Sequence, residues 1–408
     1  MRVLAALALY RLVGSTPSSA QVTPAPSSSF TAGWQDGFVL QREDGDFRLQ
    51  LNALLQADFR GVLDDPQNSV IDTFTLRRFR PILQGRVGKY FDFYFNPDFA
   101  GAAVNIRDAY VETRLSRGFR VRVGKGKEPF GLERLQGAAF LAFVERALPT
   151  AIAPDRDMGV QVVGDIAGSV VSYAAGIFNG VADGQVGEGD TNDGKDFVGR
   201  VIVRPFAPDA RHLLAGLGLA VAASSGTQPS ALPSFLSSGR QAFFVYDRSV
   251  TGQGVRRRIS PQAFYAYKAV WAFTEYVRSA GRVQKDDVGA DITHEAWVVA
   301  GSVVLTGEAA GERGVKPRND FDSVRHTWGA LQLAARYHAL TIAPATVALG
   351  FAVAGASRRA DAVTIGVNWY LNPYVKWNVD FERTVFDGRP TGVRHAEHAI
   401  LVRHQLSF

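Results

Sequence analysis

The sequence predicts an all-β protein, a transmembrane antiparallel β-barrel of about 16 strands. Apolar and polar residues alternate with period two along many segments, which is typical of strands with one apolar and one polar face. The clearest segments have about 10 to 14 residues, whereas soluble sandwich strands usually have about five or six and a strand crossing a bilayer needs about nine to eleven. Short and long connections also alternate, as in outer-membrane barrels. A soluble β-sandwich would alternate too, but the strand lengths favour a membrane barrel.

The composition is compatible with this fold and excludes several other classes. Of 408 residues, 46% are hydrophobic and 21% charged, which fits neither a disordered chain nor a helical membrane protein. The nearest candidate for a membrane helix, Leu213 to Ala223, is much shorter than the roughly 18 residues required. Because the chain has no Cys, disulfides, Cys-ligated zinc, iron–sulfur clusters and thiol nucleophiles are excluded.

The N-terminal segment resembles an export signal. Arg2 precedes an apolar stretch from Val3 to Tyr10, and small residues follow before a cleavage site. We therefore predict a signal peptide at 1–20 and an N-terminal lead-in at 21–45, of which the proline- and serine-containing part at 21–34 should lack regular structure. The barrel would occupy residues 46–408.

The first barrel strand, expected at 46–61, shows the alternation most clearly. Its apolar face carries Phe47, Leu49, Leu51, Ala53, Leu55, Ala57 and Phe59. Its polar face carries Arg48, Gln50, Asn52, Gln56, Asp58 and Arg60. Leu54 interrupts the polar face. In a barrel with an aqueous lumen, the apolar face contacts lipid and the polar face lines the interior.

The same pattern places the other strands. They are expected at 73–87, 89–99, 104–115, 119–126, 158–164, 169–179, 195–204, 212–223, 261–267, 270–279, 294–304, 327–338, 361–371, 374–386 and 396–408. The long connections, which belong to the external side, are expected at 62–72, 127–157, 180–194, 224–260, 280–293, 339–360 and 387–395. Segment 305–326 is long but falls on the periplasmic side, so it is either an insertion in a turn or a sign of two miscounted strands.

Aromatic residues near the strand ends support a membrane position. They would form the girdles that meet the two lipid–water interfaces, and they are Tyr90, Phe91, Trp369, Tyr370, Tyr374 and Trp377. The last residue, Phe408, closes an alternating strand. It resembles the terminal aromatic signal that barrel-assembly machinery reads.

Several segments resemble the phosphate-selective porin O and P family of Gram-negative bacteria. The specific ones, in chain order, are VGKGKEPFGLE, FVERALP and NWYLNP, and the resemblance extends from 46 to 408. It implies a homotrimeric outer-membrane channel with a third loop folded into the lumen and basic side chains along a route for small anions such as phosphate or polyphosphate.

Basic residues cluster around the expected third loop, 127–157. The candidate pore-lining and anion-binding residues are Arg78, Arg80, Arg86, Arg107, Arg114, Arg120, Arg122, Lys125, Lys127 and Arg134. Such a cluster in a low-dielectric wall concentrates anions and gives a channel its charge preference. A bulge at Gly124 would be needed to turn both lysines inward. The alternative is that many of them pair with acidic neighbours, namely Asp92, Asp98, Asp108, Glu112, Glu128, Glu133 and Glu145.

The third loop departs from the family pattern at one place. Family members that select phosphate carry hydroxyl residues after the GLE stretch, whereas here Glu133 is followed by Arg134, Leu135, Gln136, Gly137, Ala138 and Ala139. A site without these donors should hold phosphate only weakly, although Arg134 could supply charge.

Two other functions remain as alternatives, a weakly selective general porin for small hydrophilic solutes and, less favoured, a barrel-type outer-membrane enzyme. None of the seven His lies in a recognisable hydrolase or metal motif, so we expect no catalytic residues, no metal site and no cofactor. The run Arg256–Arg258 lacks interleaved aromatics, which disfavours nucleic acid and favours contact with lipopolysaccharide phosphates. The expected partners are small anions, outer-membrane lipid and lipopolysaccharide.

Overall fold

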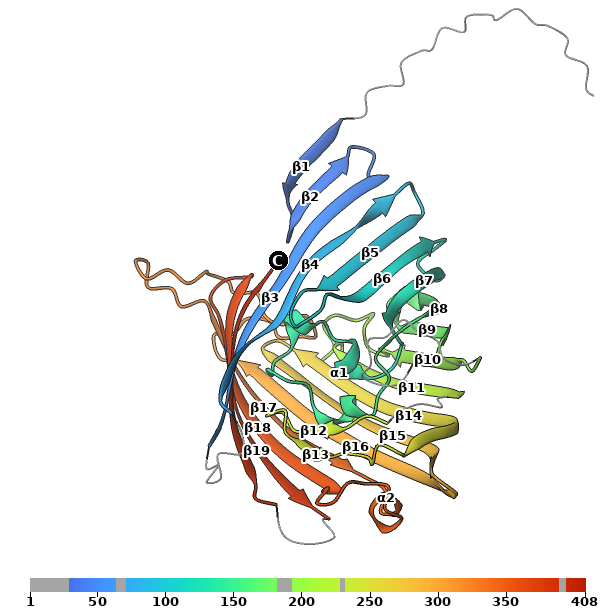
Figure 1. Cartoon of the computed structure of the whole chain (residues 1–408). Coiled ribbons are helices and arrows are strands. Elements are labelled where there is room, and N and C mark those ends of the chain that lie inside the picture. The colour runs from blue at the N-terminus through green and yellow to red at the C-terminus, as the bar shows by residue number, and fades with distance from the viewer. Residues whose placement is uncertain (1–28, 64–70, 182–192, 228–231, 389–393) are drawn as a thin grey trace, which may run out of the picture.

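A computed structural model of the chain shows a closed antiparallel barrel (Figure 1). It describes residues 29–63, 71–181, 193–227, 232–388 and 394–408; the predicted signal peptide lies outside these ranges. Strand β20 (Glu397–Ser407) pairs with β3 (Phe47–Leu63) and closes the sheet, so the predicted fold class is confirmed. Among the described residues, no helix is long and apolar enough to cross a membrane.

Sixteen strands form the barrel wall, each paired with its neighbour in chain order. Between β3 and β20 they are β4 (Thr73–Val87), β5 (Phe91–Asp98), β6 (Asn105–Arg114), β7 (Arg120–Lys127), β8 (Arg156–Ile166), β9 (Val171–Phe178), β10 (Asp196–Val203), β11 (Leu217–Thr227), β14 (Thr251–Tyr267), β15 (Val270–Lys285), β16 (Val288–Val304), β17 (Ala330–Thr341), β18 (Arg359–Tyr370) and β19 (Val375–Asp387). The short helices are α1 (Leu132–Leu135), η1 (Ala138–Phe140), η2 (Leu148–Ala151), η3 (Ala167–Ser169) and α2 (Ala345–Ala348).

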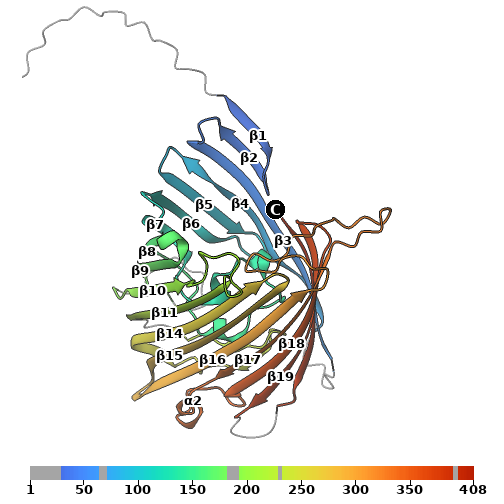
Figure 2. The same ribbon diagram turned by 180° about the vertical axis from the view of Figure 1, so that it is seen from behind.

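Part of the expected lead-in is ordered. Strands β1 (Phe30–Trp34) and β2 (Phe38–Arg42) form a hairpin that pairs with the start of β3 and extends the wall beyond the barrel, beside the C-terminus (Figure 2). The Trp34 ring packs 5.2 Å from that of Phe408, and its Nε1 donates to the Tyr374 hydroxyl. The expectation of no regular structure therefore does not hold for residues 30–34.

The alternation in β3 sorts its residues as predicted. Leu51 and Leu55 point outward and are 42% and 37% exposed, while Gln56 and Asp58 are buried inside the barrel. Leu54, which interrupts the polar pattern, is also buried and faces inward. The outer face is therefore apolar enough for lipid, and the inner face is polar with an apolar exception.

The three strands β14, β15 and β16 extend well beyond their predicted external ends. Strands β14, β15 and β16 have 17, 16 and 17 residues, and the turn between β15 and β16 consists of Asp286 and Asp287. The predicted long loop at 280–293 was therefore wrong. In this region the outward residues are charged, as with Arg282 and Asp291, while the inward residues such as Val283 are apolar, so the expected polarity is inverted.

The long periplasmic segment is an insertion, since the sixteen wall strands of the described chain pair in order without it. It spans 305–329 and joins β16 to β17. It lies at the end of the barrel that carries the tight turns between β4 and β5, between β14 and β15 and between β18 and β19. Its backbone contacts those turns, because Ala310 N donates to Lys268 O over 2.8 Å. Gly329, with φ +71°, brings the chain back against β18, where a Cβ would lie only 2.0 Å from Tyr370 O.

The aromatic girdle is mostly as predicted. Tyr90, Phe91 and Trp377 are exposed on the outer face at the barrel rim. Tyr370 is the exception, because it is buried and its hydroxyl donates to Gln332 Oε1 over 2.8 Å. Its assignment to the girdle was wrong, since its position in β18 places the ring inside the barrel.

Candidate functional site

Loop 3, residues 128–155 between β7 and β8, folds into the barrel, as the position of α1 in Figure 1 shows. Side chains of the inner wall hold its backbone. Val144 N donates to Asp380 over 2.6 Å, and Leu148 N donates to His338 Nδ1 over 3.2 Å. Its backbone is also bonded by Gln56, Glu275, Arg336, Asn368, Lys376 and Gln405. The predicted inward-folded third loop is therefore confirmed.

One carboxylate of loop 3 is clamped between two strands. Glu145 forms ion pairs with Arg60 on β3 at 3.2 Å and with Arg77 on β4 at 2.9 Å. Burial opposes ionisation of Glu145, but the charge and hydrogen bonds of Arg77 outweigh it and hold its pKa well below the usual range. This clamp fixes the far side of loop 3 to the wall.

A second carboxylate organises the root of loop 3. Asp155 lies 3.2 Å from Arg107, 3.4 Å from Arg134 and 3.2 Å from Arg156. Burial opposes its ionisation, but Arg134 and Arg156 outweigh burial and lower its pKa. Burial, with the nearby Arg134, lowers the pKa of Arg146 to about 9. Three Arg side chains therefore surround the single carboxylate of Asp155 at the root of loop 3.

A cavity of about 970 Å³, called the chamber below, lies between loop 3, the 305–329 insertion and the barrel wall. Its lining includes residues of the tight turns and the C-terminal Phe408, so it opens toward the periplasmic end. The side chains of the described lining that are charged at neutral pH are eight basic and three acidic, namely Arg80, Arg120, Arg122, Lys127, Arg156, Arg200, Arg313, Lys316, Asp36, Asp108 and Asp165.

Four of the ten predicted site residues line the chamber. Arg80 forms an ion pair with Asp98 at 2.7 Å, and Arg122 with Glu112 at 2.7 Å. Arg120 is 3.0 Å from Asp165 and 3.8 Å from Glu112. Lys127 Nζ donates to two loop 3 carbonyls, Leu135 O and Gln136 O, both over 3.0 Å. The predicted pairing with acidic neighbours is therefore present alongside the basic lining.

The other six predicted residues lie outside the chamber lining. Arg78 is buried and donates to Gln56, while Arg107 and Arg134 pair with Asp155. Arg86 and Arg114 share Asp92 near the rim, at 3.0 and 2.6 Å. Lys125 is 3% exposed and lies opposite Ala109 and Met158. Gly124 has a φ of +130°. Of the two lysines beyond it that were predicted to turn inward, Lys127 faces the chamber and Lys125 does not line it.

Four basic residues of the chamber were not among the predicted site residues, namely Arg156, Arg200, Arg313 and Lys316. Arg200 could have been found, because it occupies the inner face of β10 between outward Phe197 and Val201. Its guanidinium donates to Gln262 Oε1 over 3.0 and 2.7 Å. The two residues of the insertion carry no periodic signal.

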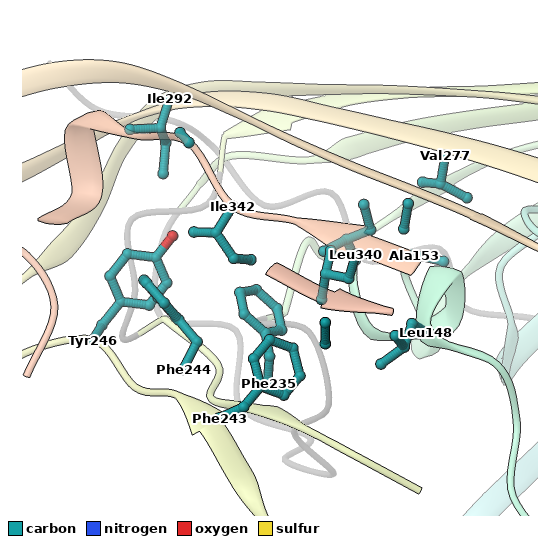
Figure 3. Packing of buried hydrophobic residues seen from close by; sticks show 14 of the residues in the cluster. Leu148, Ala153, Phe235, Phe243, Phe244, Tyr246, Val277, Ile292, Leu340 and Ile342 are labelled. Carbon is teal, nitrogen blue, oxygen red and sulfur yellow. The ribbon is translucent and has the colours of Figure 1, made fainter. Parts of the chain in front are cut away.

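The external half of the lumen is partly filled by an apolar cluster (Figure 3). Strands β12 (Phe235–Leu236) and β13 (Ala242–Phe244) bring aromatic rings from an external loop against Leu340 of β17 and Leu148 of loop 3. The Tyr246 hydroxyl lies 2.5 Å from His294 Nε2 on the inner wall. This apolar packing lies outside the chamber, whose wall is formed mainly by β3–β10.

Several solved structures have the same fold as this chain. OmpT of Vibrio cholerae in a trimer form is 11% identical, with a TM-score of 0.54, and the match covers 88% of this chain and 99% of that one. An anion-selective porin from Comamonas acidovorans is 11% identical, with a TM-score of 0.53 and coverage of 88% and 99%. OmpF of Salmonella typhi, in complex with daunomycin, is 10% identical, with a TM-score of 0.51 and coverage of 93% and 100%. These likenesses establish the fold.

A search of curated proteins found no match. A family description does match, and it covers residues 47–408, which is nearly the whole barrel. The matched region includes loop 3 and the chamber wall. The chain therefore belongs to the phosphate-selective porin O and P family and is an outer-membrane porin of a Gram-negative bacterium.

Proposed function

We propose that the protein is a passive diffusion channel whose chamber gives it a preference for small anions. The observation that carries the proposal is the excess of eight basic over three acidic side chains in the described chamber lining. In a wall of low dielectric constant, this excess raises the local concentration of anions and repels cations. Loop 3 narrows the route between the chamber and the external side.

The second candidate is a weakly selective general porin. It is supported by the ion pairs of Arg80 with Asp98 and of Arg122 with Glu112, which reduce the charge that an ion meets. Arg200 and Lys127 favour the anion channel, because within the described chain their recorded hydrogen bonds go to neutral acceptors. Membership of a porin family favours either channel over a barrel-type enzyme.

Phosphate would be held weakly under this proposal. Arg side chains could bind it through their planar forks, and Lys as a point charge. The segment of loop 3 that faces the chamber offers Leu135, Ala138 and Ala139, which have no donor groups on their side chains. We expect charge-assisted contacts without a complete donor cage, and therefore block in the millimolar range, on the order of 4 kcal/mol.

We further propose a homotrimer in contact with lipopolysaccharide. The trimer is supported by the family and by the trimer form of the Vibrio cholerae protein of the same fold. Of the predicted run Arg256–Arg258, Arg257 is exposed on the outer face, whereas Arg258 is buried. Arg278 and Arg282 also lie on the outer face of the long strands near the external end, where lipopolysaccharide phosphates lie. Cross-linking and native mass measurements in detergent test the trimer.

The direct test is planar-bilayer recording with the purified protein in a salt gradient. The reversal potential should show anion preference, and neutralising the chamber residues Arg80, Lys127 and Arg200 together should move it toward cation preference. High salt should shrink the difference, because mobile ions screen exposed charges beyond about 10 Å at 0.1 M. An unchanged reversal potential in the triple variant would show that these residues do not set the preference.

A further inference from the structure

We infer that the chamber suits organic anions with an apolar body, such as aromatic carboxylates or organophosphates, better than inorganic phosphate. This inference rests on the proposed anion channel and specifies its solute class. It is supported by two observations: the part of the chamber lining near the basic residues is apolar, and several strands and loops contribute to this apolar surface.

Two wall strands place apolar side chains beside the charged ones. Leu54 on β3 lies directly opposite Arg80 on β4 in the pairing of the two strands. Ile82, two residues further along β4, also lines the chamber. The two neighbouring strands together therefore place a cation and a hydrocarbon surface next to each other.

An aromatic column continues this surface. Tyr94 on β5 and Tyr110 on β6 are cross-strand partners with ring centroids 5.4 Å apart and planes at 19°. The Arg122 guanidinium lies 4.2 Å from the Tyr110 centroid, so cation and ring are in contact. An anion bound to Arg122 would have its substituent beside these rings.

Loop 3 and the insertion supply the opposite side. Phe140 is 42% exposed although it lies inside the barrel, and Leu135, Ala138 and Ala139 line the same space. Val315 of the insertion completes this side. An aromatic ring that is exposed in an interior chamber is unusual, since burial elsewhere would stabilise it.

The two kinds of lining favour an amphipathic solute. Inorganic phosphate needs hydrogen-bond donors around its whole surface, so an apolar wall leaves part of it unsatisfied after dehydration. A solute with one charged head and an apolar body satisfies both surfaces, as in most small-molecule sites. One aromatic contact should lower the blocking concentration about three- to tenfold.

The experiment compares block of the chloride current by two pairs of anions that share a head group, acetate with benzoate and inorganic phosphate with phenyl phosphate. The phenyl member of each pair should block at a concentration about three- to tenfold lower. Phe140→Ser should reduce both ratios toward one and leave acetate block unchanged. Ile82→Thr should also reduce both ratios, but to a smaller extent. This second variant still tests the inference if Phe140→Ser fails to fold.

Ile177→Thr is the matched control, because Ile177 lies on the outer face of β9 and is 48% exposed. It should leave both ratios as in the unmodified protein. Ratios of one in the unmodified protein, with anion preference retained, would overturn this inference and leave the proposed function standing. Cation preference would overturn the proposed function instead. Unchanged ratios in both chamber variants would show that the apolar lining is not responsible.

Discussion

The Glu145 clamp gives a prediction about how loop 3 is held. Replacing Glu145 with Gln removes the carboxylate that pairs with Arg60 and Arg77 and leaves two guanidinium groups without their partner. Loop 3 stays inside the barrel, because Asp380 and Arg336 still bond its backbone next to this position. We expect a loosened loop, seen as larger open-channel noise, and a lower thermal stability.

The loss of stability caused by Glu145→Gln can be estimated from how deeply the ion pairs are buried. Removing one partner of a buried ion pair costs about 3–5 kcal/mol. The Arg60 and Arg77 side chains are 15% and 26% exposed, so lumen water hydrates them in part, and the lower end, about 3 kcal/mol, applies here. Gln can still accept one hydrogen bond, which recovers about 1 kcal/mol. The net loss should be about 2 kcal/mol.

The assay is thermal unfolding of the detergent-solubilised protein, followed by heat-modifiable gel mobility, together with single-channel recording. Glu295→Gln is the matched control, because its ion pair with Arg278 at 3.8 Å is half exposed and contributes at most about 1 kcal/mol. If Glu145→Gln unfolds at the same temperature as the control and shows no additional noise, the clamp does not hold the loop.

The same clamp predicts the pH dependence. The folded-state pKa of Glu145 is held below the ordinary value of 4.5, so its contribution to stability is complete above pH 4.5 and is lost as the pH falls further. Channel noise should therefore be constant from neutral pH down to about pH 4.5 and rise only below it. A rise in noise between pH 7 and 5 would assign loop release to another group.

The remaining predictions concern the lipid-facing side of β3, the constriction of the pore by loop 3 and the anion selectivity of the channel. Leu51→Arg should cost up to about 1 kcal/mol, because Leu51 points outward near the barrel rim, where β3 pairs with β2, and Asn52→Ala should cost less. A larger change in gel mobility for Asn52→Ala would show that the two faces of β3 are assigned the wrong way round. Shortening loop 3 within 136–142 should raise single-channel conductance, and an unchanged value in a folded protein would place the constriction elsewhere. Arg200→Gln should reduce anion preference while the outer-surface variant Arg278→Gln should not; equal reversal potentials would exclude Arg200 from the conduction route. Phosphate should block only at millimolar concentration, and micromolar block would contradict the weak site.

Strands with lipid on one side and the lumen on the other could be predicted closely. The prediction of 73–87 coincides with β4, and the faces of β3 are as expected, because the membrane demands an apolar outer face. Outside the membrane on the external side, the outer face of a strand no longer has to be apolar. The external ends of β15 and β16 have polar outer faces and an apolar interior that packs against inward loops, so the alternation no longer indicated a strand at 280–293.

The attachment of loop 3 could not be predicted from local patterns. Val144 and Asp380 are 236 residues apart, and nothing in either segment indicates the other. The basic residues were easier to select than to place, because alternation predicts the side of a strand but not its height in the barrel. Arg86 and Arg80 share one face of β4, yet Arg80 reaches the chamber and Arg86 stays at the rim beside Asp92.

The position of the chamber has a consequence for the electrical behaviour of the channel. Its fixed positive charge lies at one mouth of the pore, while the apolar cluster lies toward the other. A voltage of one polarity therefore drives anions from the anion-rich chamber into the constriction. A voltage of the opposite polarity draws anions from the other side and lowers their concentration in the constriction. At low salt the channel should act as a rectifier, with unequal currents at equal and opposite voltages, and it should become ohmic as salt screens the charge. The sign of this asymmetry would then report the orientation in which each molecule has inserted into a bilayer.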